Sequence, residues 1–193
     1  MGLLATQLSC ASAPPLPASS ATSTPASAVS ASASHSPRAA DRKSDADRED
    51  EELDRVAAIH GAPGPWAVAG YRMGRYALAK LGLSPGSFDL VVTHHTPQQV
   101  MYSCIADGAA AATGASAGKL NLKLVESRAE DVETIYLSQS TGRAISLRPT
   151  AKFRARFSDA PRERAREFGR EVLRWPDADV FEEITAPMPR LRQ

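Results

Sequence analysis

The first half of the chain carries apolar residues at helical spacing in two long segments. Leu53, Val56 and Ile59 share one face and predict a helix over residues 45–59. A second helix is predicted over residues 66–81, where apolar positions recur between Arg and Lys in the same way. The other elements predicted in this half are a β-branched strand over residues 88–94 and a closely packing helix of small residues over residues 103–113.

The second half predicts strands and one long, charged helix. The strands, over residues 120–126, 133–138 and 143–148, alternate apolar and polar residues and follow one another as a meander. The helix, over residues 161–175, carries arginine and glutamate stripes. The stripes are offset so that each glutamate pairs with an arginine three positions later, on a solvated face.

The N-terminal segment has a different character. Residues 11–40 consist almost entirely of Ala, Ser, Pro and Thr, without an aromatic residue. Such a segment buries too little apolar area to offset the entropy lost on ordering. We therefore predict a disordered leader over residues 1–44 and a single α+β domain over residues 45–193, in which helices flank a small antiparallel or mixed sheet.

Composition excludes several classes of protein. The 193 residues include 23 Lys and Arg against 22 Asp and Glu, a net charge of +1 that gives no general attraction to nucleic acid. Two cysteines exclude a disulfide framework, and no apolar run reaches the roughly 18 residues of a membrane span. The start of the chain lacks the basic residues of a signal peptide. We therefore expect no nucleic-acid or membrane partner and a cytoplasmic location.

Residues 114–119, Gly-Ala-Ser-Ala-Gly-Lys, are similar to a phosphate-binding loop but lack two of its parts. That loop requires a glycine where Thr113 stands and a Ser or Thr where Leu120 stands, for the turn and for magnesium. The segment therefore predicts a structural loop and no nucleotide. Gly114 and Gly118 are expected to provide backbone conformations that other residues rarely adopt.

A short set of reactive side chains remains. Cys104 and Asp107 lie one helical turn apart and share a face, whereas His60, His94 and His95 lie at the ends of predicted elements. Cys with His suits a metal such as zinc, and the same residues suit a thiolate nucleophile with a base. The alternative is structural, with Cys104 as a packing thiol and the histidines facing water.

Two motifs in this region resemble those of the formylmethanofuran dehydrogenase E-subunit family. The family's opening motif is His-Gly-His-x-Cys-Pro-Gly before a helix with Gly-Tyr-Arg, and this chain has His-Gly-Ala-Pro-Gly-Pro at 60–65 and Gly-Tyr-Arg at 70–72. The second motif, Ser-Cys-x-x-Asp followed by Thr-Gly-Cys-Thr-x-Gly-Lys-Gly-Asn, is matched at 103–107 and 113–121. Order and spacing agree over about half of the chain.

The resemblance implies an α+β core, commonly a homodimer, with a cleft between the two motifs. In the family, Cys and His of these motifs are thought to form a metal-binding or active site. By position this assigns His60, Cys104 and Asp107 to the site, and it adds Lys119 and Asn121 as candidate cofactor-binding residues.

Departures from the family pattern reduce the number of candidate ligands in this site. Ala62 replaces the second histidine of the opening motif, whose cysteine is also missing, and Ala115 replaces the later cysteine of the second motif. No cysteine follows Cys104, so the family's frequent C-terminal zinc finger is absent from this sequence. A site with several thiolates is therefore excluded, and His94 and His95 are the candidates to complete the smaller site that remains.

Three functional hypotheses follow from these residues. The first is an accessory protein that binds one divalent metal, zinc as the first candidate, or a small ligand near Cys104 and a histidine. The second is an enzyme of unknown reaction that uses the Cys104 thiolate with His60, His94 or His95 as base, and Asp107 as a further candidate catalytic residue. The third is a degenerate member that keeps the fold as a homodimeric interaction module.

Overall fold

The computed structural model describes residues 43–184, and this part of the chain forms six α-helices and a five-stranded sheet. The predicted leader therefore lies almost wholly outside the described residues. The helices are α1 Asp45–His60, α2 Pro65–Leu81, α3 Val100–Thr113, α4 Ala151–Phe157, α5 Ala165–Arg174 and α6 Asp177–Val180. The strands are β1 Leu90–Thr96, β2 Leu122–Glu126, β3 Glu133–Ser138, β4 Ala144–Pro149 and β5 Phe181–Ile184.

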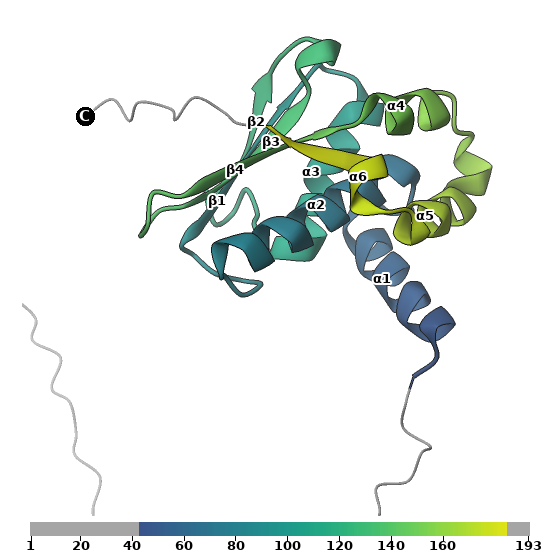
Figure 1. The fold of residues 1–193 in the computed structure, drawn as a ribbon, viewed down its shortest axis with the longest axis horizontal. Helices are drawn as coiled ribbons and strands as arrows, with labels where there is room; N and C mark the ends of the chain where they lie inside the picture. The colour runs from purple at the N-terminus through teal and green to yellow at the C-terminus, as the bar shows by residue number, and fades with distance from the viewer. Residues whose placement is uncertain (1–42, 185–193) are drawn as a thin grey trace, which may run out of the picture. The chain divides into compact units, whose positions relative to one another are not determined.

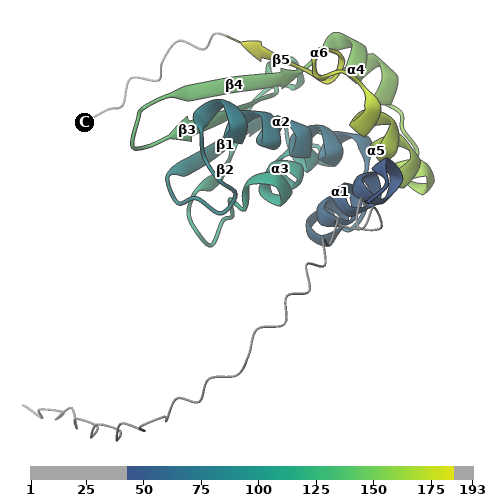
Figure 2. The same ribbon diagram turned by 60° about the horizontal axis from the view of Figure 1, so that its bottom comes forward.

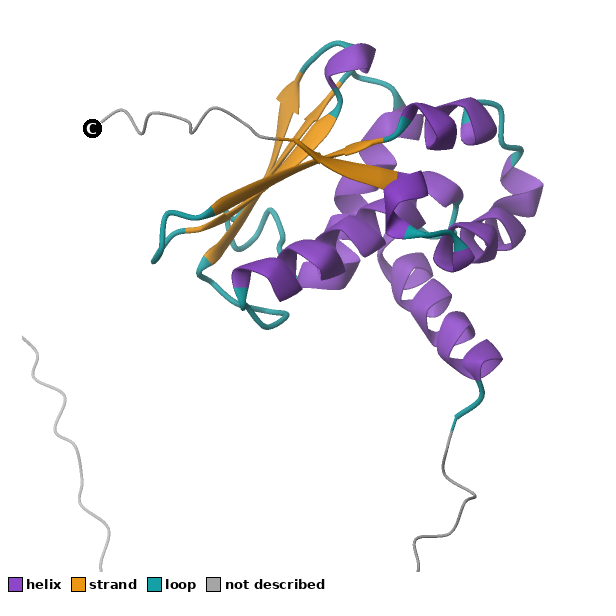
Figure 3. Ribbon diagram, viewed as in Figure 1, coloured by secondary structure: helices purple, strands orange, loops and turns teal. Residues whose placement is uncertain are grey.

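The sheet is mixed, and the helices gather on one side of it (Figures 1 and 3). Its strand order is β2-β1-β3-β4-β5, in which only β1 and β2 run parallel. This architecture confirms the predicted α+β class.

The predicted meander is wrong at one point, because β1 lies between β2 and β3. Val92 of β1 pairs with Leu122 on one side and with Tyr136 on the other. Helix α3 connects β1 to β2, and a helical crossover returns the chain parallel to the strand it left. Among the strands within residues 43–184, only β3 and β4 form a hairpin, at the turn that contains Gly142.

Helices α2 and α3 pack on the sheet and on each other with very little space between their backbones (Figure 2). A Cβ built on Gly70 of α2 would lie 2.1 Å from the Ile105 carbonyl oxygen of α3. Ala109 and Ala112 of α3 face the same contact, where both lie close to Gly74 of α2, and Ala109 is fully buried. The expectation that residues 103–113 form a closely packing helix is therefore confirmed, and α2 is its partner.

Helix α1 is tied to α5 by ion pairs that the sequence did not predict. Arg166 bonds both Asp50 and Asp54 at 2.8 Å, and Arg174 bonds Glu49 at 2.8 Å. Arg170 also bonds Asp50. The arginine stripe thus faces the acidic stretch of α1 instead of its own glutamates, because the two helices lie side by side. Helix α5 also begins later than predicted, since a 3-10 turn, η3 Arg162–Arg164, precedes it.

Candidate functional site

The two family-like motifs meet through one hydrogen bond between α1 and α3. His60 is the last residue of α1. Gly61 follows it as the C-cap of the helix, with a positive φ of 86°. The Nδ1 atom of His60 lies 2.8 Å from Oδ2 of Asp107, whose carboxylate is half-exposed. A carboxylate accepts hydrogen bonds, so Nδ1 donates, and Nε2 is the ring nitrogen that takes no part in this bond.

Cys104 lies one turn before Asp107 on the same side of α3 and is partly buried. Burial, with a smaller contribution from the nearby Asp107 charge, raises the pKa of its thiol to about 11. The Arg162 guanidinium acts in the opposite direction with a smaller effect. Cys104 is therefore a neutral thiol near pH 7. We call His60, Cys104 and Asp107 the motif cluster.

His94 is held within the core by hydrogen bonds at both of its ring nitrogens. Its side chain is fully buried, with Nε2 3.1 Å from the Tyr102 carbonyl oxygen and Nδ1 2.9 Å from the Thr134 hydroxyl. The carbonyl only accepts, so Nε2 carries the proton and Nδ1 accepts from Thr134. Burial lowers the pKa of His94 to about 4. Neither nitrogen is free for a ligand in this arrangement.

His95 lies on the opposite face of the sheet from His94. Side chains alternate along a strand, and the burial of β1 alternates in the same way. His95 pairs in register with Val125 of β2 and Glu133 of β3. The structure thus brings His60 to Asp107, with Cys104 one turn away. The ring of His94 is bonded within the core, and His95 lies on the other face of the sheet.

Lys119 and Asn121 make contacts that hold their own loop. Lys119 Nζ donates to the Gly114 carbonyl at 2.9 Å, and it lies 5.2 Å from the centre of the Phe88 ring. Asn121 is buried, and its amide donates to the Leu90 carbonyl at 3.0 Å. Its side-chain oxygen accepts from the Ser116 backbone N–H at 3.0 Å. These contacts account for both residues structurally.

The loop conformation differs from the expectation at one glycine. Gly114 has a positive φ of 70°, as predicted, whereas Gly118 does not. Leu120 takes a positive φ of 58° instead. It occupies the position at which the family motif has the glycine of Lys-Gly-Asn.

Within residues 43–184, no three His, Cys, Asp or Glu side chains converge so as to hold a metal ion. Zinc sites usually have three or four protein ligands. The motif cluster offers His60 Nε2 and the Cys104 thiol, two donor types that zinc accepts. The motif cluster of one chain therefore has too few ligands for a complete zinc site.

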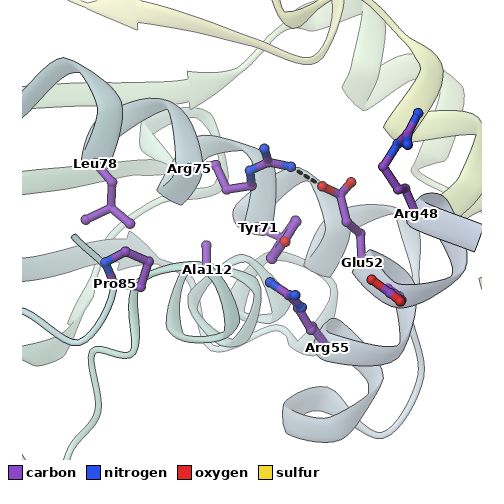
Figure 4. A pocket seen from close by; sticks show the side chains of 9 residues that line it. Arg48, Glu52, Arg55, Tyr71, Arg75, Leu78, Pro85 and Ala112 are labelled. Carbon is purple, nitrogen blue, oxygen red and sulfur yellow. Dashed lines mark hydrogen bonds and ion pairs between the residues drawn. The ribbon is translucent and has the colours of Figure 1, made fainter. Parts of the chain in front are cut away.

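A hollow of about 410 Å³ between α1 and α2 was not anticipated from the sequence (Figure 4). The charged stretch before Arg55 predicts a solvated helix face, and that pattern contains no sign of a concavity. Tyr71 is the lining residue that belongs to a family-like motif, the Gly-Tyr-Arg segment at 70–72. The lining consists of Arg48, Glu51, Glu52, Arg55, Tyr71, Arg75, Leu78, Pro85 and Ala112.

No helix within the described part of the chain is long and apolar enough to cross a membrane.

A family model matches a large part of the chain. Residues 59–182 match the sequence model of a family described as "FmdE, Molybdenum formylmethanofuran dehydrogenase operon". The matched range covers well over half of the chain and includes His60, Cys104 and Asp107. A search of curated proteins gives no match.

Proposed function

The chain belongs to the FmdE family of formylmethanofuran dehydrogenase operons, and on that premise we propose that it is an accessory protein that binds a small ligand at the motif cluster. The description of the family refers to an operon of formylmethanofuran dehydrogenase. An accessory role alongside such an enzyme is part of this proposal.

The observation that carries the proposal is the 2.8 Å bond between His60 and Asp107. It joins residues 47 positions apart and brings together the two segments that carry the family pattern. A carboxylate on Nδ1 fixes the orientation of an imidazole, as it does in many metal-ligating histidines. His60 Nε2 is therefore held in one orientation, in which it could bind a cation or a hydrogen-bond donor of a ligand.

The state of Cys104 favours binding over thiolate catalysis. A thiolate is the nucleophilic form of cysteine, and a pKa of about 11 leaves almost none of it near pH 7. Asp107 strengthens this effect, because its negative charge disfavours a second negative charge nearby. A catalytic thiolate would need the opposite surroundings.

Zinc is the metal we propose to test first, because the carboxylate–histidine pair is typical of metal-ligating histidines. The chain would supply His60 and Cys104, and the other ligands would come from solvent or from a second copy. The homodimer also stays a proposal. Since α2 covers Ala109 within one chain, Ala109 itself is not available for a contact with a second copy.

The test is a zinc titration of the purified protein by calorimetry, together with its metal content by mass spectrometry. We expect one zinc per chain or per pair of chains, and at least about tenfold weaker binding in His60→Gln and Cys104→Ser. His95→Gln is the matched control, because it removes a histidine on the far face of the sheet.

Equal loss of zinc binding in all three variants would contradict the assignment to the motif cluster. If the protein does not bind zinc, the remaining proposal is that the motif cluster binds a small organic ligand. In that case a metabolite should co-purify with the wild-type protein, and His60→Gln should abolish its binding. If denatured wild-type protein releases no metabolite and binds no zinc, the degenerate interaction module is preferred.

A further inference from the structure

The hollow between α1 and α2 has two ends of different chemistry (Figure 4). Leu78, Pro85 and Ala112 form an apolar end. Arg55 and Arg75 lie at the other end, on either side of Tyr71 in the view. The volume of the hollow, about 410 Å³, falls within the range of roughly 300–1,000 Å³ that is typical of small-molecule pockets.

Arg55 is the charge in this hollow that is left uncompensated. Among the residues that the structure describes, it has no carboxylate within ion-pair distance. Every other charged lining residue has such a partner: Arg48 with Asp45, Glu51 with Lys43, and Glu52 with Arg75. The pairs cancel, so the field in the hollow is that of one guanidinium, which attracts an anion.

Tyr71 adds a second donor beside this guanidinium. Its ring is buried, with 3% of the residue exposed, and Arg75 lies 5.9 Å from the ring centre. Burial raises the pKa of Tyr71, and Arg55 lies close enough to its hydroxyl to oppose that shift. The phenol therefore stays protonated at neutral pH and can donate a hydrogen bond.

We propose that this hollow binds a small organic anion with a carboxylate or phosphate at one end of an apolar body. Arg55 and the Tyr71 hydroxyl would hold the charged group, because both donate hydrogen bonds. Leu78, Pro85 and Ala112 would cover the apolar body. The lining of this hollow includes no residue of the motif cluster, and the proposal goes beyond the function proposed above.

The test compares three probes on the full chain by calorimetry: phenyl phosphate, inorganic phosphate and benzyl alcohol. Phenyl phosphate carries both the charge and the apolar body, and each of the others carries one of them. We expect phenyl phosphate to bind at least about tenfold more tightly than either, because hydrogen bonds to a charged group add to apolar burial.

Arg55→Gln should weaken phenyl phosphate binding at least about tenfold, and Tyr71→Phe severalfold. Arg55 is exposed, so the variant should fold normally, which a thermal melt checks. Arg128→Gln is the matched control, because it removes an exposed arginine far along the chain, paired with Asp131. Cys104→Ser should leave phenyl phosphate binding unchanged.

The result that overturns the proposal is phenyl phosphate binding that fails to saturate at millimolar concentration. It is equally overturned if Arg128→Gln weakens binding as much as Arg55→Gln, since the effect would then be general charge attraction. Weakening by Cys104→Ser would move the ligand to the motif cluster. In each case the zinc result is unaffected, so the two proposals fail separately.

Discussion

Gly108 of α3 faces Ala67 of α2 so closely that a Cβ on Gly108 would lie 1.7 Å from the Ala67 carbonyl oxygen. It would also lie 2.6 Å from the Tyr71 backbone nitrogen. Both are backbone atoms and neither can rotate away. The position of α3, and with it the meeting of Asp107 with His60, therefore depends on the absence of a side chain at this residue.

Gly108→Ala should separate the two helices and lower the free energy of unfolding by at least about 3 kcal/mol, the upper range for overpacked cores. Urea denaturation measures this change. Gly118→Ala is the control, because its Cβ would meet only the Ser116 hydroxyl at 3.9 Å. We expect the control to stay within about 1 kcal/mol of the wild type. Comparable losses in both variants would show that α2 and α3 do not meet as described.

Leu120→Gly should stabilise the protein, although it removes a large side chain. Leu120 has a φ of 58° and is 80% exposed, so it is strained and buries little apolar surface. Left-handed conformation costs a non-glycine residue about 1–2 kcal/mol, and the extra freedom of glycine in the unfolded chain offsets about half of that gain. We expect a net increase of about 0.5–1 kcal/mol by thermal or urea unfolding.

Leu124→Gly is the comparison for this substitution. Leu124 is also exposed but lies within β2, where its backbone is extended. Glycine in a strand should destabilise the protein by about 0.5–1 kcal/mol. If both variants lose stability, the loop does not hold Leu120 in the left-handed conformation.

The local elements were predictable because their cause is local. The spacing of Leu53 and Val56 places a helix over most of α1, and Gly82 ends α2 with a φ of 71°, as helix-ending glycines do. The position of β1 between β2 and β3 was not predictable from alternation alone. Alternation identifies a strand but does not specify which strand lies beside it.

Only part of the site was predictable from the sequence, namely the residues that helical spacing or motif order brings together. One turn between Cys104 and Asp107 placed them on one face, and the motif order indicated His60. His94 and His95 differ by a single position along β1, which reverses the face. The pairing of Arg166 with Asp50 and Asp54 depends on how α1 meets α5, and no pattern within either helix encodes it.

Cys104 should react slowly with iodoacetamide at pH 8, because the thiolate is the reactive form. A pKa of about 11 in place of 9.0 leaves its ionised fraction about 100-fold lower than that of an unperturbed cysteine. The rate should keep rising up to about pH 11. The measurement uses Cys10→Ser protein, so that a single thiol is followed by mass spectrometry.

Asp107→Asn tests the cause of this protection. It removes the charge that adds to burial in raising the Cys104 pKa, so alkylation at pH 8 should become faster. Urea-unfolded protein gives the reference rate. A rate in the folded wild type equal to that reference would contradict a buried, neutral thiol and would revive thiolate catalysis.

His94 should make the stability of the protein fall in mild acid. Its pKa is about 4 in the fold, because it is buried, against 6.5 in the unfolded chain. Between these values the unfolded state binds a proton that the folded state does not, so stability is full above pH 6.5 and is lost as pH falls toward 4. At pH 4.5 the loss should be about 2 kcal/mol relative to pH 7.

His94→Gln removes the titrating ring, so the free energy of unfolding of this variant should depend less on pH in this range. The variant should also be less stable than the wild type at pH 7, because it loses the bonds of His94 to Thr134 and Tyr102. The comparison is therefore between slopes from urea denaturation at several pH values, not between absolute stabilities. His95→Gln, one residue along the same strand but on the other face, should keep a slope close to that of the wild type. Parallel slopes for wild type and His94→Gln would mean that His94 is protonated in the fold, and its bond to the Tyr102 carbonyl would no longer fix a neutral ring.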